Sequence, residues 1–357
     1  MSALLSILFS VLLFSFLIFI HEFGHFIAAK KSGVQVNEFA IFMGPTIWKK
    51  QIGETLYSIK CIPIGGYCAM EGEDNDTDNP RSFQKAAWWK RLIILIAGSA
   101  MNFLAGVVIV AVVLFCQPRY ATAEVSQIED WSTLGGAAGL QIGDRIVEFN
   151  GEKIRVYEDF TYATLFLPNG EYDVTVIRDG QRVEVEDVPM YRQPVEDEDG
   201  QQVMLYGISF EVKDTTPASV PGRILPTAMN HVRSVTLSLE MLFTGRAGLM
   251  DMSGPVGIVQ IMTDAAAVSD TVATALLSML QLGGFIAINL AVMNLLPIPA
   301  LDGGRVLFLL ITTAVEAIIG RKIDPKYEAW IHGAGMVLLL ILMAVILFKD
   351  IFTIFMR

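Results

Sequence analysis

The order His-Glu-x-x-His brings His21, Glu22 and His25 together near the start of the chain. On a helix, side chains four residues apart share one face, so both imidazoles can bind the same metal ion. The carboxylate of Glu22 stands beside them, where it can accept a proton from a water that the metal activates. The three residues predict a metal site with a neighbouring base.

The apolar sequence before this motif strengthens the prediction. Leu4 to Ile20 contains no charged residue and runs directly into His21. Ionisable side chains are costly in the hydrocarbon core of a bilayer, and those found at that depth usually serve a function. A metal site is therefore favoured over a chance occurrence of the motif, which is common in soluble helices.

The composition is that of a membrane protein. The 357 residues are 53% hydrophobic and have a mean hydropathy of +0.50, which is too apolar for a soluble chain of this length. The net charge is −11, and the acidic excess lies between about Glu124 and Asp214, which predicts a water-exposed domain there. No basic stripe is present, so no nucleic-acid partner is expected. The cysteines, Cys61, Cys68 and Cys116, form no CxxC pair and are interpreted as apolar filling.

Four segments have about the ~20 residues that a helix needs to cross a bilayer. They begin with Leu4 to Ala29 and continue with Leu92 to Phe115, Ala273 to Leu296 and Gly333 to Phe348. Lysine and arginine concentrate in the loops between the first and second and between the third and fourth segments, which predicts that these loops are cytoplasmic. Both termini and the acidic domain would then lie outside the cell.

Two further segments have recognisable patterns. Leu56 to Met70 alternates partly around a Pro-x-Gly-Gly turn, which predicts an apolar β-hairpin or looped sheet that enters the membrane where protein covers its backbone. The acidic run Glu71 to Asp78 is interpreted as a solvated loop rather than a calcium site, because its spacing is wrong for a calcium loop. Ile224 to Leu242 has apolar residues at three- and four-residue steps, which predicts an amphipathic helix on the outer membrane surface.

Two histidines leave zinc short of a third protein ligand, and Asp302 can supply it. This carboxylate is expected at the cytoplasmic end of the third span, at the depth of the histidines, where Pro297 and Pro299 unwind the helix. The alternative is a carboxylate that marks the membrane boundary beside Arg305. His231 and His332 are interpreted as interfacial residues rather than ligands.

The acidic domain has a signature of its own. Gly135 to Gly151 contains Ala-Gly-Leu-x-x-Gly-Asp-x-Ile followed by Asn-Gly, and this resembles a bacterial PDZ domain. Tyr172 to Ile177 and Val183 to Val188 alternate like strands. Gly207 to Phe210 is only a distant match to the loop that binds a peptide carboxylate in such domains.

Together, these motifs resemble the site-2 protease family, and most closely its bacterial regulators of anti-sigma factors. The resemblance rests on His-Glu-x-x-His, Asn-x-x-Pro-x-x-x-x-Asp-Gly, Pro-Ile-Gly-Gly-Tyr and the inserted PDZ domain, and it covers essentially the whole chain. It implies His21, His25 and Asp302 as ligands of one zinc ion per chain and Glu22 as the catalytic acid and base. Asn294 matches an asparagine that contacts the substrate or the developing oxyanion. Gly98 and Asn102 match a Gly-x-x-x-Asn element in the second span.

The resemblance also implies an architecture and an activity. The fold class is a polytopic α-helical membrane protein of about four transmembrane helices, with a membrane-associated β-hairpin and an inserted extracytoplasmic PDZ domain. The expected domains are an N-terminal membrane core (1–118), the PDZ domain (119–214), the amphipathic helix with a linker (215–265) and a C-terminal membrane core (266–357). The expected activity is zinc-dependent endoproteolysis of transmembrane segments in a bacterial inner membrane. The substrates would be single-span proteins such as anti-sigma factors already shortened by another protease. Many Gram-negative relatives carry tandem PDZ domains, whereas this chain has room for one.

Two other functions use the same residues. A zinc transporter or metal sensor would need a second metal site along a path, and no other intramembrane His/Asp cluster is evident in the sequence. A catalytically idle scaffold would bind partners through the PDZ domain, and the intact Glu22 argues against it. Zinc-dependent peptide cleavage by the purified protein separates all three functions.

Overall fold

The computed structural model describes residues 3–73, 77–135, 139–196, 202–248, 252–321, 324 and 326–356. Residues 74–76 of the acidic run and residues 136–138 of the glycine-rich signature lie outside this part. The chain forms two compact units, one of Met1–Ile109 with Val235–Arg357 and one of Val110–Ser234.

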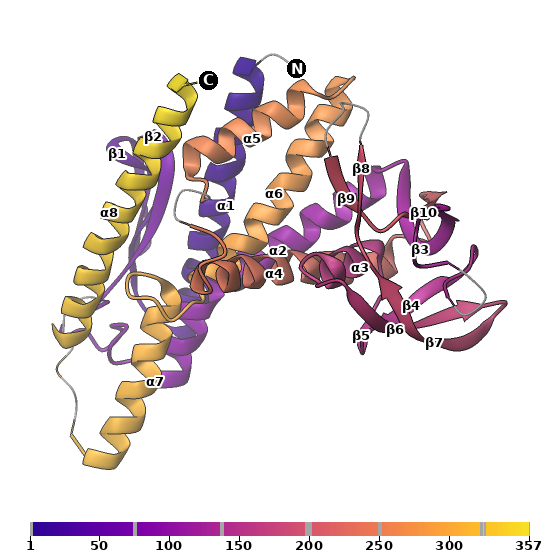
Figure 1. Cartoon of the computed structure of the whole chain (residues 1–357). Coiled ribbons are helices and arrows are strands. Elements are labelled where there is room, and N and C mark those ends of the chain that lie inside the picture. Colours follow the sequence, from indigo (N-terminus) through magenta and orange to yellow (C-terminus); the bar gives the residue numbers. More distant parts are fainter. Residues whose placement is uncertain are drawn as a thin grey trace. The chain divides into compact units, whose positions relative to one another are not determined.

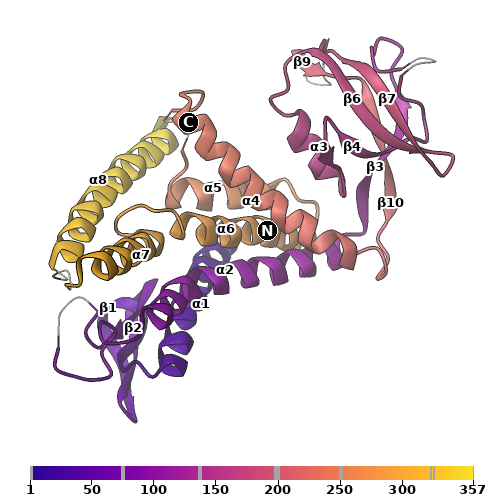
Figure 2. The ribbon, with the colours of Figure 1, turned by 90° about the horizontal axis from the view of Figure 1, so that it is seen from below.

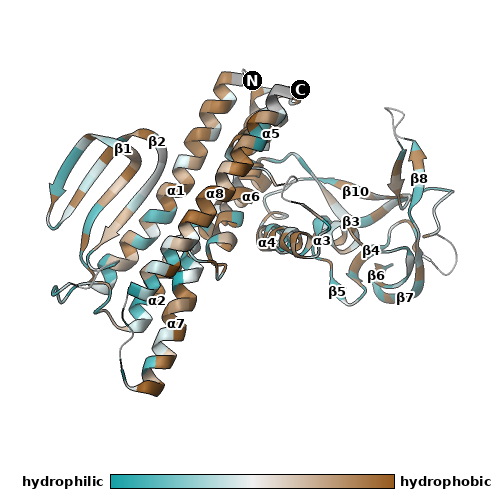
Figure 3. Ribbon diagram, turned by 60° about the vertical axis from the view of Figure 1, so that its left-hand side comes forward, coloured by the Kyte–Doolittle hydropathy of each residue, from teal (hydrophilic) through white to brown (hydrophobic). Residues whose placement is uncertain are grey.

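Within the residues that the structure describes, four helices are long and apolar enough to cross a membrane, as the sequence predicts. They are α1 (Ala3–Ser32), α2 (Trp88–Cys116), α6 (Val272–Asn294) and α8 (Lys326–Met356). Hydrophobic residues cover most of their length (Figure 3). Each is longer than the ~20 residues that span the hydrocarbon core, so each can reach both interfaces.

Besides these four and a short helix in the second unit, three more helices occur in the described part of the chain (Figures 1 and 2). α4 (Pro221–Phe243) occupies the segment predicted to be amphipathic, and α5 (Pro255–Ala267) follows it. α7 (Asp302–Ile319) lies between the third and fourth spans, where the sequence predicts a loop. This prediction is wrong because the prolines reverse the chain only before Asp302, and the apolar residues after Arg305 continue as a regular helix.

Two long strands, β1 (Val36–Ile52) and β2 (Thr55–Met70), form an antiparallel sheet beside α1 (Figure 3). The hairpin predicted over Leu56 to Met70 is wrong in its turn: the chain reverses at Gly53, with φ +61°, and the predicted hairpin is the single irregular strand β2. The register explains this, because Ile41 pairs with both Ile59 and Gly66. The first half of β1 therefore lies between the two halves of β2.

Aromatic and polar contacts fix this sheet against α1. The ring of Phe26 lies 4.9 Å from that of Phe39 and 6.0 Å from that of Tyr57, measured between centroids. Nearer the start of α1, the hydroxyl of Ser15 donates a 2.7 Å hydrogen bond to the carbonyl of Pro63. Because a free carbonyl is costly in an apolar surrounding, this bond stabilises the bend in β2 at the depth of the membrane helix.

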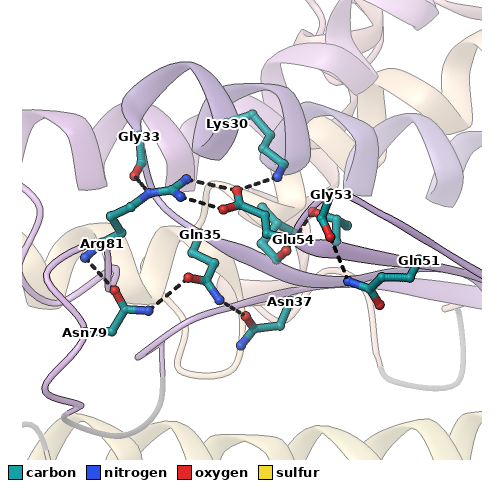
Figure 4. A network of polar contacts seen from close by, with 11 residues as sticks. Lys30, Gly33, Gln35, Asn37, Gln51, Gly53, Glu54, Asn79 and Arg81 are labelled. Atoms are coloured by element: carbon teal, nitrogen blue, oxygen red, sulfur yellow. Dashed lines mark hydrogen bonds and ion pairs between the residues drawn. The ribbon is translucent and has the colours of Figure 1, made fainter.

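A polar network joins the end of α1 to the sheet (Figure 4). Lys30 donates a 2.7 Å hydrogen bond to Glu54, and Arg81 bonds both Glu54 and the carbonyl of Gly33. The hydrogen bonds from Arg81 and Lys30 lower the pKa of Glu54 to about 2. The carboxylate therefore stays ionised at physiological pH and keeps the sheet turn beside the helix end.

The unit Val110–Ser234 is built on a six-stranded sheet. The strand order is β10-β3-β4-β6-β7, with β5 paired to β4. These strands are β3 (Arg119–Ile128), β4 (Arg145–Phe149), β5 (Glu152–Lys153), β6 (Gly170–Arg178), β7 (Gln181–Met190) and β10 (Ile208–Asp214). A short helix, α3 (Tyr157–Thr164), packs on this sheet, and β8 (Gln193–Glu196) pairs separately with β9 (Gln202–Leu205).

The Gly-Asp pair of the glycine-rich signature has a structural role in this unit. The carboxylate of Asp144 is fully buried and accepts hydrogen bonds of 2.8 and 2.7 Å from Arg178. It also accepts the backbone N–H of Gln141 at 2.8 Å. The hydrogen bonds to Asp144 raise the pKa of Arg178. Removing one partner of such a buried pair strongly destabilises a fold.

Candidate metal centre

The structure brings His21, His25 and Asp302 together. The two histidines lie on α1, and Asp302 is the first residue of α7. Oδ2 of Asp302 lies 3.1 Å from Nε2 of His21 and 3.3 Å from Nε2 of His25, and the two Nε2 atoms are 3.2 Å apart. Three donors that each lie ~2.0–2.2 Å from one tetrahedral zinc are about 3.3 Å from one another. The observed separations therefore fit a single zinc ion.

The Asp302 carboxylate gives a second reason to place a cation there. Its Oδ2 atom is buried and has no hydrogen-bond donor in the part of the chain that the structure describes. A buried carboxylate oxygen without a partner is costly, and a metal ion removes that cost. Within the described ranges, these residues form the one cluster of three potential ligand groups. His231 and His332 lie outside it, in agreement with their interpretation as non-ligands.

Helix α2 supplies the partners that orient the imidazoles. Nδ1 of His25 lies 2.8 Å from the carbonyl oxygen of Ile94, so the ring donates its Nδ1–H there and leaves Nε2 free for a metal. The amide of Asn102 lies 3.4 Å from Nδ1 of His21. Its oxygen is buried without a partner, and turning the amide by half a turn would let that oxygen accept the Nδ1–H. The sequence analysis assigned neither contact, although the Gly98-x-x-x-Asn102 spacing signalled one of them.

Two glycines allow α1 and α2 to approach this closely. A Cβ at Gly98 would lie 2.3 Å from Nε2 of His25 and 2.8 Å from Cε1 of His21. A Cβ at Gly24 would lie 2.4 Å from the carbonyl oxygen of Ala97. All three distances are too short for a real side chain. The expectation that Gly98 permits close helix packing agrees with this geometry, and Gly98 also forms one wall of the ligand cluster.

The third donor arrives through a tight chain reversal after α6. α6 ends at Asn294, and residues 295–301 fold back to start α7 at Asp302. A Cβ at Gly303 would lie 2.3 Å from the carbonyl oxygen of Leu295, so only glycine fits there. Arg305, one turn further on, forms an ion pair with Glu73 in the segment after β2.

The two remaining predicted residues lie beside the cluster rather than in it. Glu22 follows His21 on α1, and β2 passes close to it: a Cβ at Gly66 would lie 3.6 Å from Cγ of Glu22. Asn294 is the last residue of α6. Among the described residues, the hydrogen-bond partners of the three clustered side chains come from α2, and Asn294 is not one of them.

Comparison with known proteins identifies the family. The model of peptidase family M50 matches residues 9–342. The chain belongs to this family. It is a membrane-embedded zinc metalloprotease of the site-2 protease group, and the resemblance seen in its motifs is confirmed.

Relatives that align over nearly their whole length support the assignment. A protein of Clostridium acetobutylicum whose name places it among zinc metalloproteases is 36% identical over 353 residues, which is 97% of each chain. The regulator of sigma-W protease RasP of Bacillus subtilis is 29% identical over 423 residues, which covers 96% of this chain and 97% of RasP. RasP of Bacillus licheniformis is also 29% identical, over the same shares of the two chains.

The wall formed by Gly98 gives a first prediction. We expect Gly98→Ala to lower zinc affinity and cleavage by on the order of 100-fold, because the new methyl group would occupy the space of the His25 imidazole. Bound zinc is measured by elemental analysis, and cleavage is measured on the same preparation. Gly222→Ala is the matched control, since a Cβ at Gly222 meets no atom within 4 Å. Normal zinc content in Gly98→Ala would contradict the close approach of α1 and α2.

Proposed function

We propose that this metalloprotease cleaves transmembrane segments of other membrane proteins inside the bilayer. Its zinc ligands are His21, His25 and Asp302, its acid and base is Glu22, and Asn294 binds the substrate carbonyl. The observation that carries the proposal is the convergence of two imidazoles of a membrane-length helix with a buried carboxylate oxygen that has no other partner.

The side chains around the cluster divide the chemistry between them. Zinc, when bound, polarises both the water and the scissile carbonyl. Glu22 accepts a proton from that water and returns it to the amide nitrogen that leaves. The Asn294 amide donates a hydrogen bond to the carbonyl oxygen as negative charge develops on it. Ile94 keeps the imidazole of His25 in the tautomer that leaves Nε2 unprotonated, and Asn102 with its amide turned would do the same for His21.

A helical substrate must unwind before cleavage, because its carbonyls are occupied by internal hydrogen bonds. The second half of β2 suits an unwound segment. Gly66 to Met70 pairs with β1 on one side, and Gly66 lies against Glu22. We therefore expect the substrate to pair with this edge as an extended strand. Its peptide bonds would then be exposed next to Glu22.

The unit Val110–Ser234 contains the proposed PDZ domain. Supporting features are the Asp144–Arg178 pair in its Gly-Asp turn and the position of β10 at the edge of the sheet. Gly207, with φ +71°, precedes β10, and the ring of Phe210 lies 5.1 Å from that of Phe160 in α3. We propose that this domain and α4 act as a gate that admits substrates already shortened on the outside. The name of RasP refers to regulation of sigma-W, which makes anti-sigma factors the substrate class to test first.

The transporter and scaffold alternatives have less support. Transport needs a second metal site, and within the described ranges no other group of three His, Cys, Asp or Glu side chains lies close enough together to hold a metal ion. A scaffold needs no acid and base, whereas Glu22 stands beside the cluster. Membership of a metalloprotease family adds to both arguments.

Glu22 provides the direct test of the proposed chemistry. We expect Glu22→Gln to retain zinc and to lose cleavage by on the order of 10³-fold or more, because the amide cannot accept the proton. A substrate with one transmembrane helix and a tag at each end reports cleavage by purified protein. Turnover near the wild-type rate in Glu22→Gln would refute the proposed role.

The roles of Asp302 and Asn294 separate in the same assay. We expect Asp302→Asn to lower both zinc content and cleavage, and Asp302→Ala to lower them further, because the site loses its anionic ligand. Asn294→Ala should keep its zinc and slow cleavage, since its proposed partner is the substrate oxygen. Full zinc occupancy in Asp302→Ala would mean that the third ligand lies elsewhere.

The orientation in the membrane is open to labelling. The basic loops place Lys49 in the cytoplasm and Asp179 outside. In a background with Cys61, Cys68 and Cys116 replaced by alanine, Asp179→Cys should react with an impermeant thiol reagent on intact cells. Lys49→Cys should react only after the membrane is opened. The reverse pattern would overturn the orientation and the gate.

A further inference from the structure

The turn that carries Asp302 has a backbone N–H that it cannot satisfy by itself. Leu301 N–H donates to the carbonyl of Ile298 at 3.1 Å, so residues 298–301 form a β-turn. Pro299 and Ala300 are its central residues, and Ala300 has φ +81°. Proline followed by a residue with positive φ is the pattern of a type II turn, and the N–H of that second residue has no acceptor inside the turn. Asp302 lies two residues beyond Ala300.

Helix α8 supplies the missing acceptor. The N–H of Ala300 donates a 3.1 Å hydrogen bond to Nδ1 of His332. Nδ1 is therefore unprotonated, and the ring carries its hydrogen on Nε2. One turn further along α8, a Cβ at Gly335 would lie 2.4 Å from Cβ of Pro299 and 2.8 Å from its carbonyl oxygen. The imidazole of His332 and the backbone at Gly335 therefore contact the two central residues of the turn.

The turn needs this support because of the residue at its third position. Positive φ is normal for glycine and rare for alanine, whose Cβ crowds the backbone there. A strained conformation of this kind persists only where the surroundings hold it. If the turn relaxed, Asp302 two residues beyond Ala300 would shift, and Oδ2 would lose its present separations of 3.1 and 3.3 Å from Nε2 of His21 and His25.

The rest of α8 shows that this contact is local. Beyond Gly335, apolar side chains of α8 are more than half exposed within the chain, among them Val337, Leu338 and Ile341. Near its other end, Asp350 accepts the N–H groups of Gly254 and Gly257 at the start of α5, at 3.0 and 2.8 Å. α8 is thus fixed by polar contacts near its two ends, one of which bears on the turn before Asp302.

We infer that His332 and Gly335 are positioning residues that hold the Pro299–Ala300 turn and thereby place Asp302 for zinc binding. Among the described residues, the cluster consists of His21, His25 and Asp302, so neither residue is one of its ligand groups. The inference rests on the proposed ligand role of Asp302. It gives a function to His332, which the sequence does not connect with the metal-binding motifs.

Substitutions at His332 test the hydrogen bond by its geometry. Asn places its amide oxygen near the position of Nδ1, whereas Gln places it near that of Nε2, and Leu offers no acceptor. Zinc affinity is measured in the purified full-length protein by competition with a chromophoric chelator. We expect His332→Asn to bind zinc within a few-fold of wild type, and His332→Gln and His332→Leu to bind it on the order of 10-fold more weakly. Excess zinc should restore their cleavage.

Two glycines of α8 provide a matched pair for the packing contact. Gly335→Ala introduces the clash with Pro299 and should weaken zinc binding. Gly333→Ala, two residues away, meets no atom within 4 Å and should leave zinc binding unchanged. Equal zinc affinity in the two variants would overturn the role of Gly335.

A rescue experiment separates positioning from a general loss of helix packing. Ala300→Gly removes the cost of positive φ, so the turn should form without its acceptor. The double variant His332→Leu with Ala300→Gly should therefore regain most of the zinc affinity lost in His332→Leu. The inference is overturned if His332→Leu binds zinc like wild type, if Asn is as defective as Leu, or if glycine at 300 gives no recovery. Asp302→Ala is the reference: if it keeps zinc, the proposed ligand set fails instead.

Discussion

The close approach of α1 and α2 is the constraint on which the rest of the metal centre depends. In a helix, the carbonyl of Ile94 accepts the N–H of Gly98, and the bare Cα of Gly98 leaves room for the His25 ring to reach the same oxygen. That one contact uses a backbone group that an apolar helix always has. It orients an imidazole inside a hydrophobic surrounding without adding another ionisable side chain, which would be expensive there.

The third ligand group, the carboxylate of Asp302, is positioned in a different way. A carboxylate cannot be buried in a membrane core without a partner, so Asp302 is delivered at the start of α7 by a turn rather than from within a span. The turn brings its own difficulty, an alanine at positive φ with an N–H pointing outward, and His332 resolves it. Zinc binding and local folding are therefore linked, because the position of Oδ2 depends on α8 as well as on α7.

The proposed reaction needs an extended substrate next to Glu22, and the sheet beside α1 answers that need. β2 passes the acid and base at Gly66 while β1 holds it from the other side. Unpaired backbone in the bilayer is tolerated only where protein or a cavity covers it. An incoming strand would cover the edge of β2. The hydrogen bonds formed with β2 would then offset the free-energy cost of breaking the hydrogen bonds of the substrate helix.

The sequence by itself predicted the four membrane-length helices and the residue types of the candidate metal site. Apolar length defines a membrane helix regardless of its neighbours, and the four-residue spacing places His21 and His25 on one face of any helix. The sequence also indicated Asp302 as a candidate third ligand, because Pro297 and Pro299 after the third span predict a break in the helix just before it. The turn of the sheet at Gly53 was not predicted, because β1 pairs with both halves of β2 and local sequence signals do not reveal such a register. Helix α7 was also missed, because prolines precede it in the sequence. The roles of Ile94 and Asn102, and the contact of His332 with Ala300, were decided only by the tertiary structure. Each joins residues at least 32 positions apart, and only the packing of α2 and α8 brings them together.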